Sequence, residues 1–418
     1  MLAFPGNVAD VARVKRKAAK LLLTDSRNPL MLSLRPRSRP RSVTPAASPE
    51  GGTDMKKALA VLSALLLVAI VATTVSCAQP EKLAVGIVLP TKDEPRWIQD
   101  QTRFEAALKA AGHNVEILFS QGDSSKEKAN VEALITKGAK VIVICPQDAS
   151  AAAAAADAAA KAGVKIISYD RLIRDTSAVD YYVTFDSIAV GAAWGDYLIK
   201  NATGTGNNLF LYAGAASDNN AFIFFEGAWS ALQPKIADGT FVIRNSSEAV
   251  ALQNKAKLTR EEMAKIIGQV TTNWDFNVAK SKAEADLTAA DKASKGTVYI
   301  CAPNDGTARA IADAFGADKD VTKYFISGQD AEKASVQYII DGKQSMTVFK
   351  DVRMLVDDAI KAAIALIEGK APAARGSYNN GKKDVPAIQS PVITVDKANV
   401  KSILIDGGYY AAADFTGL

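Results

Sequence analysis

Histidine and cysteine are scarce in this sequence, and their scarcity limits the chemistry that the protein can perform. Among 418 residues there are one histidine, His113, and three cysteines. His113 lies beside Gly112 in a predicted helix-to-strand turn, so neither a His-dependent triad nor a metal site is supported. No ligand spacing typical of structural zinc is present. We therefore expect no metal and no cofactor.

Two motifs of catalytic proteins are also missing. The sequence has no GxxxxGK[ST] loop, which excludes a P-loop ATPase, and no GxSxG elbow of a serine hydrolase. Paired acids such as Asp170 and Asp330 can cleave glycosides. However, Arg171 beside Asp170 is expected to keep that carboxyl ionised rather than raise its pKa as a general acid requires. The sequence therefore predicts a protein that is not an enzyme.

The excess of positive charge is confined to the first part of the chain. The net charge is +5, but residues 1–76 contain 12 Lys and Arg against 4 Asp and Glu, which leaves −3 for the remainder. Proteins that bind nucleic acid need a basic surface to displace phosphate counterions. A slightly acidic body therefore argues against a nucleic-acid partner.

The beginning of the chain divides into two segments of different composition. Residues 1–54 are rich in Arg, Pro and Ser and are predicted to be either upstream sequence from a mis-chosen start codon or a disordered arm. Residues 55–76 have a basic start and an uncharged apolar run, as in a secretory signal peptide. A transmembrane anchor is the alternative, because roughly 18 apolar residues nearly span a bilayer. The residues before Cys77 resemble a relaxed bacterial lipobox, which predicts lipidation of Cys77 and an extracytoplasmic, membrane-anchored protein.

The rest of the chain alternates apolar runs with segments of helical period. Runs such as 83–89, 141–145 and 164–169 are rich in β-branched residues, which is typical of parallel strands covered by helices on both faces. The pattern starts again with predicted strands at 209–213 and 297–301. We therefore expect an α/β fold with two doubly wound parallel-sheet lobes.

Two cysteines other than Cys77 remain to be assigned. Cys145 and Cys301 each end an apolar run, in different halves of the chain. A disulfide between them would have to cross from one lobe to the other, so we favour buried free thiols.

An extra segment, residues 246–270, interrupts the second lobe. Within it, Thr259 and Glu262 have the spacing of a capping box that opens a helix through Ile267. The segment could be a lid, a partner surface or an ornament, and the sequence does not choose between them.

Polar side chains follow five of the predicted strands. In open parallel sheets, ligands bind beyond the carboxyl ends of the strands. Carboxylate, amide and guanidinium groups can each satisfy two neighbouring sugar hydroxyls, and an aromatic face can cover the apolar side of a pyranose. Any one of these residues is equally well explained as a helix cap or a loop residue, but their agreement favours a sugar site. The segments are 90–97, 170–171, 217–220, 304–305 and 329–330.

Several motifs resemble the type I periplasmic sugar-binding proteins of ABC importers, in particular the xylose-binding and multiple-sugar-binding (glucose/galactose/xylose) group. The resemblance runs from about residue 83 to the C-terminus. Its motifs are Tyr169-Asp170-Arg171-Leu172-Ile173-Arg174, Tyr182-Val183-Thr184-Phe185-Asp186, Asp218-Asn219-Asn220-Ala221, Ser327-Gly328-Gln329-Asp330-Ala331-Glu332, Met346-Thr347-Val348-Phe349-Lys350 and Asn379-Asn380-Gly381.

The resemblance implies a set of ligand-binding residues. Asn219 could exchange roles with Asn220, because the motif does not say which side chain points inward. Trp274 is implied to pack on the sugar ring, although the extra segment shifts the alignment just before it. Trp97 is a second stacking candidate or a core residue. The implied contacts to sugar oxygens come from Arg96, Asp170 and Arg171 in the first lobe and from Asn220, Asn304 and Asp330 in the second, with Lys350 at a hinge crossing.

The family fold also implies that three chain segments cross between the lobes. These crossings are expected near Asp186, Phe349 and Ala371. The implied boundaries are 82–185 plus 349–370 for lobe 1 and 186–348 plus 371–418 for lobe 2.

The resemblance implies a mechanism of hinge closure. A monosaccharide would bridge both lobes and stabilise the closed form, which would dock, as a monomer, on a membrane permease served by a separate ATPase. Alternatives within the fold are a nucleoside or furanone ligand, or a sugar sensor coupled to a chemoreceptor. A transcriptional regulator of the same core is a further alternative, but the secretory signal occupies the place of its DNA-binding domain.

Overall fold

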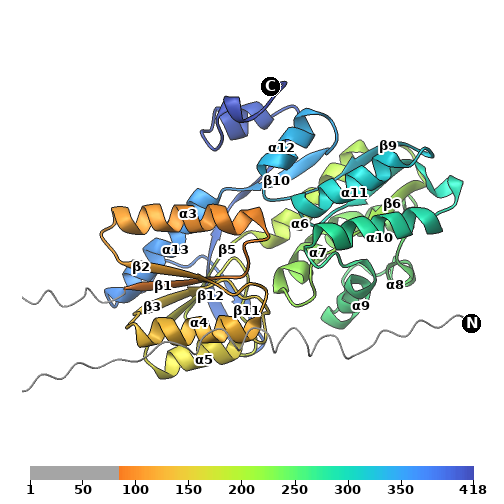
Figure 1. Ribbon diagram of the computed structural model, residues 1–418. Helices are drawn as coiled ribbons and strands as arrows, with labels where there is room; N and C mark the ends of the chain where they lie inside the picture. Colours follow the sequence, from red (N-terminus) through yellow and green to blue (C-terminus); the bar gives the residue numbers. More distant parts are fainter. Residues whose placement is uncertain (1–83) are drawn as a thin grey trace, which may run out of the picture. The chain divides into compact units, whose positions relative to one another are not determined.

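The structure is a computed structural model that describes residues 84–418. The predicted leader (1–54), signal peptide (55–76) and lipidated Cys77 lie outside the described residues. Within the described part, the chain forms two large sheets, each with helices on both faces (Figure 1). The predicted α/β fold with two doubly wound lobes is confirmed. None of the helices in 84–418 combines the length and apolar character needed to span a bilayer.

The larger sheet is the centre of lobe 1. In spatial order its strands are β11 (Ser377–Asn379), β12 (Asp384–Ser390), β5 (Tyr181–Phe185), β4 (Lys165–Tyr169), β3 (Val141–Ile144), β1 (Val85–Leu89) and β2 (Val115–Phe119). All neighbours run parallel except β11, which is antiparallel to β12. Strands β1 and β3 are buried along their whole length, as continuous apolar runs predict. Helices α3 (Pro95–Ala110) and α13 (Val352–Ile367) pack on one face, and α4 (Ser124–Thr136) and α5 (Ala153–Lys161) on the other.

The smaller sheet is the centre of lobe 2. Its strands, all parallel, are β7 (Phe241–Ile243), β6 (Asn207–Leu211), β8 (Gly296–Cys301) and β9 (Val321–Ile326). Helices α6 (Ser187–Asn201) and α7 (Asn219–Ala237) cover one face, and α10 (Phe276–Ala289) and α11 (Asp305–Ala317) cover the other. Helix α12 (Lys333–Ile340) follows β9.

The extra segment forms two helices, α8 (Ser247–Ala251) and α9 (Arg260–Val270). The predicted capping box is confirmed: the Thr259 hydroxyl accepts from the Glu262 backbone N–H, and the Glu262 carboxylate accepts from the Thr259 N–H. The helix ends at Val270, three residues after the predicted end. Its apolar side, including Met263, is buried in the same core as α7. The segment is therefore integral to lobe 2.

Three segments connect the lobes. The chain crosses between β5 and α6, between β10 (Met346–Lys350) and α13, and between β12 and β13 (Val392–Asp396). Strands β10 and β13 pair with each other in an antiparallel ladder. The predicted third crossing near Ala371, which assigned all of 371–418 to lobe 2, is wrong. Strand β12 pairs in parallel with β5, so residues 377–390 belong to the sheet of lobe 1.

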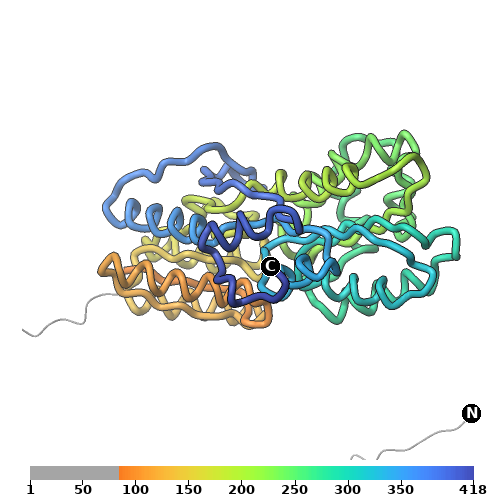
Figure 2. The backbone as a smooth tube through the Cα atoms, turned by 90° about the horizontal axis from the view of Figure 1, so that it is seen from above, coloured from red at the N-terminus to blue at the C-terminus, as the bar shows by residue number. Residues whose placement is uncertain are grey.

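The last residues of the chain contact both lobes. Val400, Leu404 and Phe415 are buried against α12 and β10 of lobe 2. Figure 2 shows this C-terminal segment, in dark blue, between α3 of lobe 1 and the elements of lobe 2. The Tyr409 hydroxyl donates to Gln99 Oε1 of α3 at 2.9 Å, and the Tyr410 hydroxyl donates to the Ala331 carbonyl of lobe 2 at 2.9 Å.

The prediction of buried free thiols is confirmed. Cys145 and Cys301 are both free and buried. Burial raises the pKa of the Cys301 thiol to about 12 and that of Cys145 well above its ordinary value, so both remain neutral.

Candidate binding site

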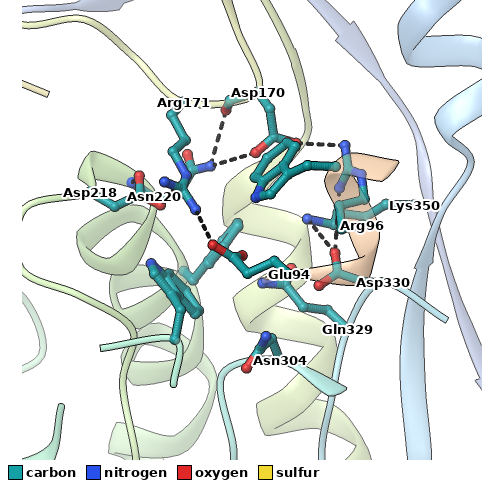
Figure 3. A pocket seen from close by; sticks show the side chains of 13 residues that line it. Glu94, Arg96, Asp170, Arg171, Asp218, Asn220, Asn304, Gln329, Asp330 and Lys350 are labelled. Carbon is teal, nitrogen blue, oxygen red and sulfur yellow. Dashed lines mark hydrogen bonds and ion pairs between the residues drawn. The ribbon is translucent and has the colours of Figure 1, made fainter. Parts of the chain in front are cut away.

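A cavity lies where the strand ends of the two lobes meet (Figure 3). Its lining comes from segments far apart in the sequence, because parallel strands place their carboxyl ends at one edge of each sheet. The lining residues are Glu94, Arg96, Trp97, Asp170, Arg171, Asp218, Asn220, Phe224, Trp274, Asn304, Gln329, Asp330 and Lys350.

Asp170, the first residue after β4, is held by its backbone in a conformation that few side chains tolerate. Its φ is 58°, in the left-handed region. Its N–H donates to the Val183 carbonyl at 2.8 Å, and its carbonyl accepts from the Tyr182 hydroxyl at 2.7 Å and from Asn220 Nδ2 at 3.0 Å. Several bonds thus fix one strained residue, as is common at functional sites.

Arg96 joins acidic groups from both lobes. It lies in the first turn of α3, which Pro95 begins. Its guanidinium is 2.7 Å from Asp100 (Nε to Oδ2), 3.0 Å from Asp170 (Nη2 to Oδ2) and 3.4 Å from Asp330 (Nη1 to Oδ1). Lys350 Nζ adds an ion pair of 2.8 Å with Asp330 Oδ1. These side chains are 9% exposed or less, so their charges are compensated by pairing rather than by water.

The charges around Asp170 set its protonation state. Burial raises the pKa of this carboxyl, but Lys350, Arg96 and Arg171 lower it more, so the pKa lies below its ordinary value. The expectation that Asp170 stays ionised is confirmed, with Lys350 and Arg96 acting together with Arg171. Asp170 is therefore a hydrogen-bond acceptor at neutral pH.

Arg171 connects the lobes on the other side of the cavity. Its Nε lies 2.9 Å from Asp218 Oδ2 of lobe 2, and its Nη2 lies 3.3 Å from Glu94 Oε1. Burial raises the pKa of Asp218 to about 6, although Arg171 opposes this shift. The guanidinium carbons of Arg171 and Arg96 each lie 5.1 Å from the Trp97 ring centre. Trp97, which is 2% exposed, is thus both a core residue and part of the cavity wall.

The Trp274 indole lies in the cavity wall and packs closely on Gly214, in the segment that follows β6. Its φ is 61°, and its indole covers Gly214 so closely that a Cβ there would lie 1.9 Å from the ring. The ring also makes an edge contact with Phe224 of α7, with centroids 6.4 Å apart. The absence of a side chain at Gly214 therefore permits this position of the indole.

Asn304 and Asp330 contribute polar groups from the strand ends of lobe 2. Asn304 caps α11, its Oδ1 accepting from the Thr307 N–H at 3.3 Å and from the Thr307 hydroxyl. The Nδ2 group is therefore the donor that it can offer to a ligand. Asp330 follows β9 with a φ of 97°, and its N–H donates to the Val348 carbonyl at 3.0 Å.

The structure brings together every predicted site residue except Asn219. The Asn219 Oδ1 accepts instead from Arg174 and Arg260, outside the cavity, and Asn220 occupies the cavity wall. Four lining residues were not predicted as site residues. Three of them lay inside the polar segments already identified, and the fourth is one helical turn after Asn220 on α7. They are Glu94, Asp218, Gln329 and Phe224.

A larger recess adjoins the cavity. The two share Glu94, Arg171, Asp218, Trp274 and Asn304 in their walls. The lining of the recess includes residues of both lobes, such as Thr91 and Phe276. In the part of the chain that the structure describes, no cluster of side chains has the composition of a metal site.

Known proteins resemble this chain over most of its length. The family model described as periplasmic binding protein domain matches residues 85–371. The multiple sugar-binding periplasmic receptor ChvE of Rhizobium radiobacter is 34% identical, covering 79% of this chain and 92% of its own length. The D-xylose-binding periplasmic protein of Haemophilus influenzae is 31% identical, covering 84% of this chain and 97% of its own.

Solved structures resemble it as well. A carbohydrate transporter solute-binding protein from Chloroflexus aurantiacus, in complex with D-glucose, is 78% identical with a TM-score of 0.80, covering 80% of this chain and 99% of that one. An ABC transporter solute-binding protein from Clostridium phytofermentans, with bound β-D-glucose, is 31% identical with a TM-score of 0.71, covering 79% and 99% of the two chains. The chain belongs to the periplasmic binding protein family.

Proposed function

We propose that this protein binds an aldopyranose such as D-glucose, D-xylose or D-galactose in the cavity and delivers it to an ABC importer. The observation that carries the proposal is the ionised Asp170 surrounded by donors from both lobes. A carboxylate accepts from two neighbouring hydroxyls at once, whereas guanidinium, ammonium and amide groups donate to others. A wall that offers both acceptors and donors suits a ligand that carries a hydroxyl on almost every carbon.

Three polar atoms in the cavity wall support a polar ligand. Within the described residues, Trp97 Nε1, Trp274 Nε1 and Gln329 Oε1 are buried and have no hydrogen-bond partner. A buried donor or acceptor without a partner costs about 1–3 kcal/mol. Ligand hydroxyls that pair with these atoms would remove that cost.

The ligand of a second solved relative, β-D-glucose, is a single sugar ring. The D-glucose complex of the 78% identical protein and the multiple-sugar-binding relative support the same ligand class.

The walls of the cavity come from both lobes, so a ligand that contacts both walls favours closure of the lobes. Arg96 and Arg171 from lobe 1 pair with Asp330 and Asp218 from lobe 2. A sugar that bonds to both walls binds more strongly to the closed form, and this difference in affinity shifts the population towards closure. We expect the sugar to leave chemically unchanged, and the lowered pKa of Asp170 makes this carboxyl unsuited to act as a general acid.

Calorimetry of the purified protein with D-glucose, D-xylose and D-galactose tests the proposal. We expect saturable binding with one site for at least one of these sugars. Absence of binding to all three would overturn the sugar assignment. Binding to a nucleoside or a furanone instead would keep the family and change the ligand class.

We further propose that the protein is exported and anchored by lipidation of Cys77, and that its closed form docks as a monomer on a permease with a separate ATPase. The sequence from residue 55 to Cys77 supports export and anchoring. Expression of the full chain with labelled palmitate should label the wild-type protein but not Cys77→Ala. Equal labelling of both would exclude this anchor.

A further inference from the structure

Arginine side chains from both lobes converge on the Asn219 side chain, outside the sugar cavity. Arg174 Nη1, from lobe 1, donates to Asn219 Oδ1 at 3.3 Å, and Arg260 Nη1, from lobe 2, donates to the same oxygen at 2.9 Å. Asn219 is 4% exposed. One amide oxygen thus links the two lobes through guanidinium groups.

The lobe 2 side of this contact is supplied by the extra segment. Arg260 is the first residue of α9, whose start is fixed by the capping box of Thr259 and Glu262. The Arg260 guanidinium carbon lies 3.8 Å from the centre of the Phe222 ring on α7. The helix and the ring therefore hold this guanidinium beside Asn219.

The lobe 1 side is supplied by the turn that follows β11. Asn380, which is fully buried, donates from Nδ2 to the Ile173 carbonyl at 3.2 Å and to the Thr176 carbonyl at 2.8 Å. Next to it, Gly381 has a φ of 92°, and a Cβ there would lie 2.6 Å from Asp175 Oδ1. The Asn379-Asn380-Gly381 turn therefore fixes the loop that carries Arg174.

We propose that Arg174, Asn219 and Arg260 form a latch that stabilises the closed lobes and raises the affinity for sugar without touching it. Arg174 makes the bond between lobes, and Arg260 is a positioning residue that orients Asn219. A neighbouring backbone bond between the lobes, from the Ala149 N–H to the Ser217 carbonyl at 2.9 Å, places the latch at a point of direct contact. Because only the closed form encloses the ligand, the apparent affinity scales with the population of that form. The inference rests on the proposed function.

The charges in the latch predict that one substitution should increase the affinity for sugar. Two guanidinium groups share a neutral oxygen, and the neighbouring carboxylate, Asp175 Oδ1, lies 3.9 Å from Arg174 Nη2. Asn219→Asp keeps the size of the side chain and turns both contacts into ion pairs. It also places a negative charge in the first turn of α7, where the helix dipole favours it. This variant should bind D-glucose more tightly than the wild type.

Calorimetry with D-glucose on five variants and one control tests the latch. Arg174→Ala should weaken binding by roughly tenfold, Arg260→Ala should weaken it less, and the double variant should match Arg174→Ala alone, because Arg260 acts through the bond that Arg174 makes. Asn219→Asp should gain affinity in the wild-type background and lose that gain when Arg174 is replaced. Arg375→Ala is the matched control: Arg375 is exposed, and within residues 84–418 its side chain forms no hydrogen bond or ion pair.

Small-angle scattering separates failure of the latch from failure of the sugar assignment. Without sugar, Arg174→Ala should populate a more open form than the wild type, and Asn219→Asp a more closed one. If the wild type does not bind D-glucose but these shifts appear, the latch stands and the ligand is wrong. Unchanged affinity and unchanged scattering in both arginine variants, or strictly additive losses in the double variant, would overturn the latch.

Discussion

The guanidinium of Arg171 and the carboxylate of Asp218 form an ion pair between the two lobes, with Nε 2.9 Å from Oδ2 and both side chains 5% exposed or less. Each charge is removed from water on closure, and each depends on the other for compensation. This pair therefore couples closure of the lobes to the charge of one carboxyl.

Replacing Asp218 by Asn should weaken sugar binding strongly. The amide can still cap α7, as the carboxylate does through the Asn220 N–H, but Arg171 keeps Glu94, at 3.3 Å, and the Pro146 carbonyl, at 3.5 Å, as its remaining partners. We expect the affinity for D-glucose to fall roughly 100-fold, because truncating one member of a buried charged pair costs several kcal/mol. Asp238→Asn removes an exposed carboxylate and is the control. A loss of less than threefold in calorimetry would contradict the coupling.

The Asn304→Asp variant should keep the helix cap but lose the hydrogen bond to the ligand. Aspartate keeps the oxygen that caps α11, so the midpoint of thermal unfolding should not fall. The Nδ2 donor is lost and replaced by a second acceptor, so the affinity for D-glucose should fall by one to two orders of magnitude. Asn304→Ala should lose both binding and about 1 kcal/mol of stability. Equal affinity of the Asp variant and the wild type would remove Asn304 from the site.

Gly214→Ala should impair binding through the position of Trp274. The added Cβ would lie 1.9 Å from the indole, so the ring must move. We expect at least a tenfold loss of affinity and a changed tryptophan emission spectrum, with the far-ultraviolet circular dichroism preserved. Gly268→Ala in α9 is the control, since a Cβ there meets no atom within 4 Å and should stabilise the helix by up to about 1 kcal/mol. Wild-type affinity in Gly214→Ala would show that the indole position is unimportant.

Glu127→Gln should change how stability depends on pH. Glu127 is fully buried in α4, its Oε2 accepts from the Gln147 N–H at 2.7 Å, and burial raises its pKa from 4.5 to about 7. Because the folded pKa is the higher one, its contribution to stability is complete below about pH 4.5 and is lost as the pH rises through about 7. Gln does not ionise, so the difference in unfolding free energy between variant and wild type should move by about 3 kcal/mol in favour of the variant across that range.

Urea unfolding at a series of pH values measures this difference. The wild type is measured at each pH as the reference for the variant, so titrations common to both proteins cancel in the difference. A difference that stays constant from pH 4 to pH 8 would mean that Glu127 does not titrate in this range.

The sequence was most informative where strands are continuous apolar runs and polar residues follow them. Asp170, Asn304 and Asp330 could be predicted because each lies within four residues of the end of a strand, and parallel pairing places those ends at one edge of each sheet. Phe224 was overlooked, although it lies four residues after Asn220 and hence on the same side of α7.

Other features depend on contacts that a local pattern does not contain. Strand β12 includes Pro386 and polar residues, and it becomes a strand because it pairs with β5, about 200 residues earlier in the chain. Asn219 and Asn220 are adjacent on α7, so they point about 100° apart. The contacts of Asn219 with Arg174 and Arg260, and of Asn220 with Asp170 and Tyr182, decide which of them faces the cavity.

The left-handed backbone at Asp170 and Asp330 limits how this site could diversify during evolution. Such a conformation is accessible at low cost mainly to glycine, asparagine and aspartate, so most other residue types would add strain at these two positions. Asn220 and Phe224 lie on a regular helix whose backbone accepts nearly any side chain. New ligand preferences should therefore arise through substitutions on α7, while the backbone conformation favours retention of the two aspartates.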